Sequence, residues 1–330
     1  MNGRIDLSQA ESVLDIVQSK TEASLRLAVQ GLAGKLSEQI RAIRNELLSV
    51  LAYLTARIDF PEDEVEEHDS LEVIGKAFRD LKNLIAGADA GIIYRQGIRT
   101  AIVGRPNVGK SSLLNRLLRE NRAIVTPIPG TTRDTLEETV NLKGVPFLLI
   151  DTAGIIKSED AIEALGVERS RKAIAQADLV LLVIDASESL SAADSDIIAL
   201  LDEKTVLVAA NKCDLPPGAY FGGLRWPVIS ISALTSEGMS TLEEKMVDVA
   251  LGGRVVSSDA FLVTNVRHKE ALQRASKHLS QAQESLEANM PDDFVTIDLT
   301  AALNALGEIT GETVTEDLLN TIFSRFCVGK

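Results

Sequence analysis

The sequence predicts an α/β domain, with a mostly parallel sheet and helices on both faces, inserted into an all-α helical domain. A strand, a glycine-rich loop and a helix are expected to follow one another between Ile98 and Leu118 of the 330 residues. On both sides of the central region, apolar residues recur at intervals of three and four, the period of an amphipathic helix. The expected limits are residues 1–95 and 251–330 for the two parts of the helical domain, and residues 96–250 for the α/β domain.

The helical pattern covers residues 8–58, where Gly31 and Gly34 are expected to interrupt it. It returns over residues 71–85, 259–288 and 295–326. No helix in either flank can bury its apolar stripe alone, so we expect the two flanks to pack into one helical domain. Two separate bundles are the alternative.

The central loop, Gly104 to Ser111, has the sequence GRPNVGKS and matches the phosphate-binding P-loop pattern G-x-x-x-x-G-K-[ST]. The flanking segments are expected to be a buried strand, Ile98 to Gly104, and an apolar-faced helix, Ser111 to Leu118. Backbone N–H groups would face the β-phosphate, Lys110 would add its charge near the β- and γ-phosphates, and Ser111 would ligate Mg²⁺. The expected nucleotide-binding residues of this loop are Asn107, Val108, Gly109, Lys110, Ser111 and Ser112.

Further nucleotide motifs follow in order. Asp151 to Gly154 (DTAG) follows an apolar run, and Asp151 would hold Mg²⁺ through water. Asn211 to Asp214 (NKCD) includes Lys212, and the Asp214 carboxylate would accept hydrogen bonds from N1–H and the amine of guanine. The base pocket would be closed through a backbone N–H to the guanine oxygen by Ser232, Ala233 and Leu234. The order predicts a GTPase domain of the translation-factor class.

A polar segment between the P-loop and DTAG, Thr126 to Asp134, contains Thr132, the candidate switch threonine that completes the magnesium shell. A glutamine after DxxG positions water in Ras-like enzymes, but Ile155 stands there and offers no hydrogen bond. Another group must orient the attacking water. Arg133 is one candidate for the transition-state cation, as an arginine acting in cis.

Composition sets limits on function. The hydrophobic fraction of 45% allows a sizeable core, and no apolar run approaches 18 residues, so a cytoplasmic protein without a membrane span is expected. Two cysteines exclude a disulfide framework and a zinc cluster. The net charge of −14 disfavours tight RNA binding by this chain alone.

Two terminal segments carry a specific resemblance. Phe326 to Lys330 (FCVGK) and Asn2 to Val17 (NGRIDLSQAESVLDIV) are similar to the corresponding segments of the MnmE (TrmE) family of tRNA-modification GTPases. The resemblance extends over essentially the whole chain. It implies that a folate-binding and dimerisation domain precedes Asn2 in the family, with Arg4 and Lys330 aligning with positions that line the folate site.

The resemblance also implies roles for individual residues. Glu163 would orient the attacking water through a second water, so the expected catalytic residues are Glu163, Lys110 and Thr132. K⁺ would stabilise the transition state when two GTPase domains dimerise. Its expected ligands are Asn107, Thr126, Ile128 and Thr131, and those of Mg²⁺ are Ser111 and Thr132. Cys327 has two readings, a catalytic thiol or an idle one.

The implied function is hydrolysis of GTP, dependent on Mg²⁺ and K⁺, during modification of the wobble uridine of tRNA. The group installed on carbon five is carboxymethylaminomethyl or aminomethyl. The implied partners are the flavoprotein MnmG (GidA), tRNA through the complex, and a second copy bound through the GTPase and N-terminal domains, with a folate derivative as a cofactor of the intact family protein. The alternative is a regulatory GTPase of the Era or Der type, a nucleotide-switched docking module in ribosome assembly.

Overall fold

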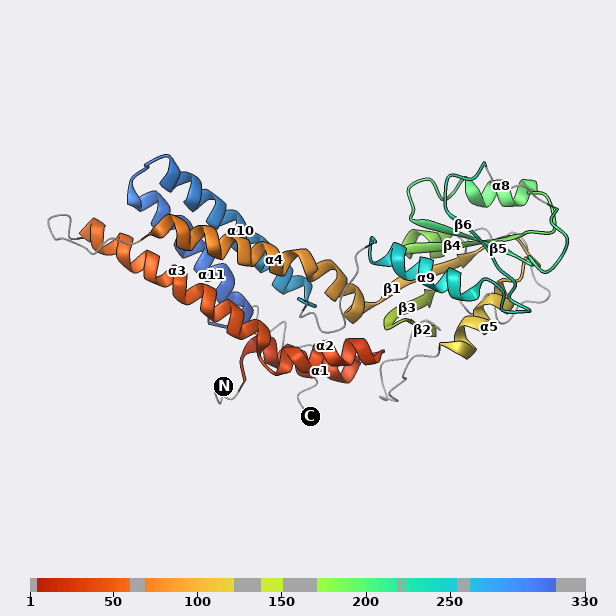
Figure 1. Cartoon of the computed structure of the whole chain (residues 1–330), viewed down its shortest axis with the longest axis horizontal. Helices are drawn as coiled ribbons and strands as arrows, with labels where there is room; N and C mark the ends of the chain where they lie inside the picture. Colours follow the sequence, from red (N-terminus) through yellow and green to blue (C-terminus); the bar gives the residue numbers. More distant parts are fainter. Residues whose placement is uncertain are drawn as a thin grey trace. The chain divides into compact units, whose positions relative to one another are not determined.

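The computed structural model describes residues 5–59, 69–121, 138–150, 171–218, 221, 223–253 and 262–312. The chain divides into two compact units. One consists of Met1–Ser19, Ser24–Arg95 and Val256–Lys330, and the other of Lys20–Ala23 and Gln96–Val255. The first is helical and the second contains a six-stranded sheet (Figure 1), so the predicted fold class is confirmed.

The helical unit is built from six labelled helices. They are α1 (Leu7–Gln18), α2 (Glu22–Leu32), α3 (Lys35–Asp59), α4 (Ser70–Gln96), α10 (Val266–Glu287) and α11 (Asp292–Thr310). A capping box starts α1, in which Asp6 and Gln9 each accept a hydrogen bond from the other's backbone N–H. Gly34 has φ 84° and separates α2 from α3, as predicted, whereas Gly31 lies inside α2 and does not interrupt it.

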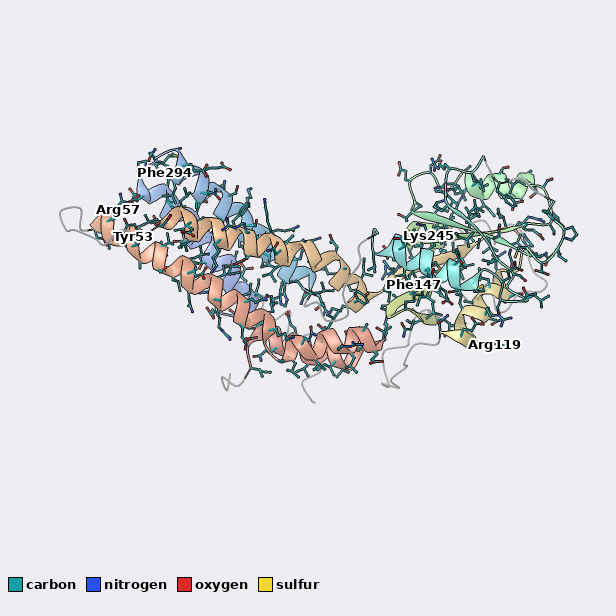
Figure 2. All side chains as sticks on the ribbon, in the orientation of Figure 1. Tyr53, Arg57, Arg119, Phe147, Lys245 and Phe294 are labelled. Atoms are coloured by element: carbon teal, nitrogen blue, oxygen red, sulfur yellow. The ribbon has the colours of Figure 1, made fainter. Side chains whose placement is uncertain are left out.

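One core joins the N-terminal and C-terminal flanks. Its fully buried side chains include Leu47 of α3, Leu81 of α4, Leu279 of α10 and Leu299 of α11. Burying each such leucine contributes about 1.5–3 kcal/mol, so neither flank retains this stabilisation alone. The expectation of one shared helical domain is confirmed. Figure 2 marks Tyr53 and Arg57 near the end of α3, where the guanidinium lies 5.7 Å from the ring centroid.

Two predicted helical limits need correction. The helix expected from residue 259 begins only at Val266, because Asn265 caps it by accepting a hydrogen bond from the Arg267 N–H. The pattern expected over residues 295–326 starts earlier, at Asp292 after Pro291, and its first helix ends at Thr310. Gly311 adopts φ 85° and bonds back to the Gly307 carbonyl, a conformation that stops a helix.

The sheet of the second unit has the order β2-β3-β1-β4-β5-β6. Only β2 is antiparallel to its neighbour, and the other pairs are parallel. The strands are β1 (Ile98–Val103), β2 (Glu138–Leu142), β3 (Val145–Ile150), β4 (Leu179–Asp185), β5 (Val206–Asn211) and β6 (Val228–Ser230). β1, β3, β5 and β6 match the predicted strands to within a residue, whereas β2 and β4 were not predicted.

Helices cover both faces of this sheet. α5 (Lys110–Glu120) and α9 (Met239–Ala250) lie on one side, and α8 (Ala192–Ile198) lies on the other (Figure 1). Phe147 of β3, labelled in Figure 2, is fully buried. Among the helices that the structure describes, none combines the length and apolarity needed to cross a membrane.

Parallel strands bring their carboxyl ends to the same edge of a sheet, where open α/β folds bind ligands. The P-loop follows β1, Asp185 ends β4, Asn211 ends β5, and Ser232 follows β6. The topology therefore gathers the nucleotide motifs of the described residues at one edge.

Candidate nucleotide-binding site

The P-loop is shaped by two glycines whose positions exclude a side chain. Gly104 has φ 154°, and a Cβ there would lie 2.3 Å from the Val183 carbonyl oxygen of the neighbouring strand β4. Gly109 has φ 94° at the N-cap of α5. Between them Asn107 adopts φ 66°, a left-handed conformation that asparagine tolerates better than most residues. The loop can therefore turn tightly into α5, whose N-terminus attracts anions.

Lys110 folds back over the loop that precedes it. Its Nζ donates hydrogen bonds to the carbonyl oxygens of Gly104 (2.7 Å) and Arg105 (2.6 Å). Burial disfavours the charged ammonium and lowers the pKa of Lys110 from 10.5 to about 8. A polyphosphate beside this ammonium would favour its charged form.

Asn211 connects the P-loop to the predicted base loop. Its Nδ2 donates to the Val108 carbonyl oxygen at 2.8 Å, and its Oδ1 accepts from the Ala233 N–H at 3.0 Å. The side chain is buried, and a Cβ added to Gly109 would lie 2.2 Å from Nδ2. The asparagine thus fixes the distance between the phosphate-binding and base-binding loops.

Lys212 pairs with Asp185, a residue that the motifs did not indicate. Its Nζ lies 2.6 Å from Asp185 Oδ2, while Asp185 Oδ1 accepts hydrogen bonds from the Ser187 N–H (3.0 Å) and Oγ (2.6 Å). Burial tends to raise the pKa of Asp185, but the hydrogen bonds from Lys212 and Ser187 outweigh it and lower that pKa. The buried carboxylate holds the lysine at the end of β5.

Arg105 fastens the opposite side of the P-loop. It pairs with Glu188, and its Nε lies 3.3 Å from Asp194 Oδ2. Asp194 is buried in α8 and forms a capping box with Ser191. These contacts join the P-loop to the segment between β4 and α8.

The base loop has a buried start and an exposed tip. Ser232 and Ala233 are buried, and Ser232 Oγ accepts a hydrogen bond from the Thr235 N–H at 3.1 Å. Leu234 is 78% exposed. Asp214 is exposed in the loop after β5, where its carboxylate can meet a ligand.

The structure thus brings together the predicted residues of the P-loop, of NKCD and of the 232–234 loop. Sequence reasoning missed Asp185, Arg116, Glu188 and Asp194. For Asp185, the continuous apolar run that forms β4 was an available signal. The remaining predicted residues lie outside the described part of the chain: Arg4, Thr126, Ile128, Thr131, Thr132, Arg133, Asp151, Gly154, Ile155, Glu163, Cys327 and Lys330.

Comparisons with known proteins agree on one family. The family model described as the MnmE helical domain matches residues 7–327. The tRNA modification GTPase MnmE of Roseiflexus castenholzii is 51% identical over 346 residues, covering 100% of this chain and 74% of the relative. The MnmE of Desulforamulus reducens is 46% identical over 339 residues, with the same coverage. The G domain of the T. maritima FeoB iron transporter is 27% identical over 46% of this chain and 98% of its own, with a TM-score of 0.35, which carries no argument here.

Proposed function

This chain belongs to the MnmE family of tRNA modification GTPases, and we propose that K⁺-activated GTP hydrolysis by this chain acts in modification of the tRNA wobble uridine. The modification would place a carboxymethylaminomethyl or aminomethyl group on carbon five, in a complex with the flavoprotein MnmG. The observation that supports the nucleotide site most directly is the Asn211 bridge from Val108 to Ala233.

Guanine recognition rests on two loops at the carboxyl edge of the sheet. The exposed Asp214 carboxylate would accept from N1–H and the exocyclic amine, a pair of donors that adenine lacks. The guanine oxygen would accept a backbone N–H from the 232–234 loop. Since a buried or bound polar group left unpaired is costly, adenine nucleotides would bind far more weakly.

The residues present suit hard cations. Ser111 offers a hydroxyl at the start of α5, as Mg²⁺ ligation in a P-loop requires. The exposed Asn107, held at φ 66° in the loop, offers an amide oxygen that suits K⁺. Bound there, the two ions would neutralise charge that develops on the phosphates.

This chain's own groups would do the rest. Lys110 would bind the β- and γ-phosphates from the position in which it now bonds two loop carbonyls. Thr132 and Asp151 would complete the magnesium shell, and Glu163 would orient the attacking water. Pairing of two GTPase domains would complete the K⁺ site with Thr126, Ile128 and Thr131.

The proposal is tested by steady-state GTP hydrolysis in KCl and in NaCl at equal ionic strength. Asn107→Ala is compared with Asn115→Ala, which removes the same side chain from an exposed position on α5. We expect K⁺ to stimulate the wild type and Asn115→Ala at least about tenfold, a change of about 1.4 kcal/mol in the barrier, and not to stimulate Asn107→Ala. Equal rates in both salts for the wild type would contradict K⁺ activation.

A further inference from the structure

Arg116 of α5 donates hydrogen bonds to two consecutive carbonyl groups of the base loop. Its Nη2 lies 2.9 Å from the Leu234 oxygen, and Nη2 and Nε each lie 3.3 Å from the Ala233 oxygen. The motifs did not single out this arginine. It sits one and a half helical turns after the phosphate-binding start of α5, so one helix carries both the P-loop contacts and a contact to the base loop.

The geometry of the peptide bond gives this contact a consequence. The Ala233 C=O and the Leu234 N–H belong to one planar trans peptide and point in opposite directions. A guanidinium fixed on the Ala233 oxygen therefore fixes the direction of the Leu234 N–H. The guanidinium fork suits this task, because its donors are planar and rigidly spaced.

The preceding peptide is already used. The Ala233 N–H donates to Asn211 Oδ1 at 3.0 Å. No described residue accepts a hydrogen bond from the Leu234 N–H, and Leu234 is 78% exposed. Of these two N–H groups, the one from Leu234 is the group open to a ligand.

We propose that Arg116 is a positioning residue for base recognition: it orients the Leu234 N–H to donate to O6 of guanine. The positive guanidinium also polarises the shared peptide and makes that N–H a stronger donor. Asn211 holds the loop at one peptide and Arg116 at the next, so the loop has a fixed orientation before nucleotide binds. This inference rests on the proposed guanine site and names the donor within it.

Arg116 also contacts Glu120 one turn along the helix, at 3.3 Å from Nη1 to Oε1. An exposed pair of this kind contributes little and does not touch the base loop. Glu120→Gln is therefore the matched control: it removes the ion pair and leaves the two carbonyl contacts. Arg116→Met removes the fork and keeps most of the apolar stem.

The test measures dissociation constants of the full chain for three ligands. GDP has the O6 acceptor, 6-thio-GDP replaces it by a sulfur that accepts hydrogen bonds poorly, and inorganic tripolyphosphate has no base. We expect Arg116→Met to weaken GDP about tenfold and to leave tripolyphosphate within about twofold. We expect the preference for GDP over 6-thio-GDP to fall towards one in this variant, and Glu120→Gln to match the wild type.

A structural role alone would not change the preference between GDP and its thio analogue. The inference is overturned if Arg116→Met keeps the wild-type preference, or if it weakens GDP and tripolyphosphate equally. A wild type that binds GDP no better than ADP would instead overturn the guanine site itself, and the inference with it.

Discussion

The ammonium of Lys212 and the carboxylate of Asp185 face each other across adjacent parallel strands, with Nζ 2.6 Å from Oδ2. In the register of β4 and β5, Asp185 pairs with Asn211, the residue before the lysine. The strand register therefore places a buried acid beside the lysine of the base-recognition motif. The two residues form one unit of the site, although only one belongs to the motif.

Asp185→Asn should weaken GDP binding about fivefold and lower the free energy of unfolding by about 1–2 kcal/mol, because Lys212 loses its charged partner. Fluorescence titration and urea unfolding measure the two effects. The control is Asp202→Asn, whose partner Arg225 lies with it on the surface. An Asp185→Asn variant that behaves like this control would show that the pair does not support the site.

The lowered pKa of Lys110 predicts a pH dependence of binding. Below pH 8 the ammonium is charged and can meet the phosphates. As the pH rises through about 8, binding must first protonate it. The affinity should therefore fall about tenfold between pH 7 and pH 9. Tripolyphosphate should show the same fall as GDP, because it carries no guanine to ionise, and an affinity that is flat over this range for both ligands would contradict the prediction.

Asn211→Ala should be among the most damaging single changes in the α/β unit. It leaves the Val108 carbonyl and the Ala233 N–H without their partner, at a cost of about 2–4 kcal/mol. Urea unfolding measures this cost, with the exposed Asn115→Ala as the control. A loss below about 0.5 kcal/mol would mean that these two groups find other partners.

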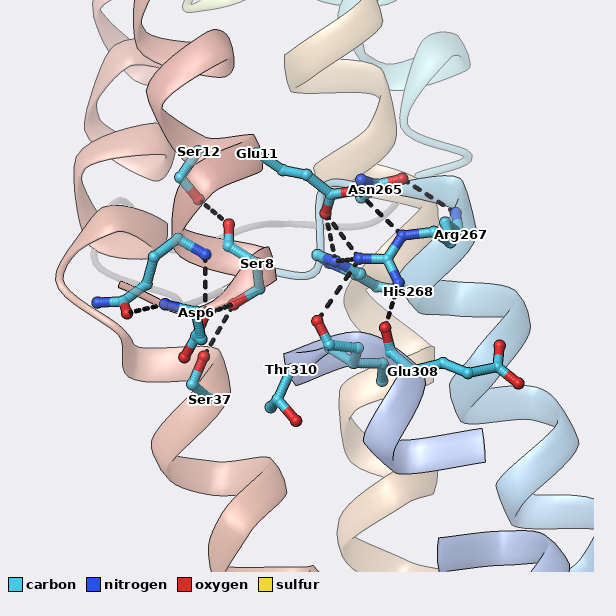
Figure 3. Close-up of polar contacts among 12 residues, drawn as sticks. Asp6, Ser8, Glu11, Ser12, Ser37, Asn265, Arg267, His268, Glu308 and Thr310 are labelled. Atoms are coloured by element: carbon cyan, nitrogen blue, oxygen red, sulfur yellow. Dashed lines mark hydrogen bonds and ion pairs between the residues drawn. The ribbon is translucent and has the colours of Figure 1, made fainter. Parts of the chain in front are cut away.

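A buried ionic cluster in the helical unit gives a separate prediction (Figure 3). Arg267 of α10 donates to both carboxylate oxygens of Glu11 on α1, His268 Nε2 lies 2.8 Å from Glu11 Oε2, and Arg267 also bonds the Glu308 carbonyl at the end of α11. Burial tends to raise the pKa of Glu11, but the bonds from His268 and Arg267 lower it to about 2. The cluster ties three helices together.

Glu11→Gln should therefore lower the free energy of unfolding at pH 7 by about 3 kcal/mol. This difference from the wild type should be complete above pH 4.5 and should vanish as the pH falls towards 2. Burial lowers the pKa of His268 as well, so the wild type should also lose stability as the pH drops below 6.5. Urea unfolding followed by circular dichroism measures both, with the exposed Glu284→Gln as the control, and equal stability of the two variants at pH 7 would refute the cluster's role.

Local signals in the sequence were enough for the P-loop, four of the strands and the helical flanks. Strand β3 agrees with its prediction at both ends, because six buried residues in a row leave little ambiguity. The helix limits failed where one residue decides the backbone, as Gly311 does at the end of α11. Apolar periodicity continues past such a residue and does not show the break.

The supporting contacts of the site could not be predicted, because their partners are distant in sequence. Arg116 is 117 residues from Ala233, and Arg105 is 83 residues from Glu188. A motif names the groups that meet the ligand. The groups that hold them in place are specified only by the sheet order and register.

The most direct test of guanine recognition is a base swap at Asp214. Xanthine carries a carbonyl where guanine carries its amine, so an asparagine amide at this position would suit xanthine and an aspartate would suit guanine. Dissociation constants for GDP and XDP should show at least about a hundredfold preference for GDP in the wild type and a reversed preference in Asp214→Asn. An Asp214→Asn variant that still prefers GDP would contradict the assignment of the base pocket.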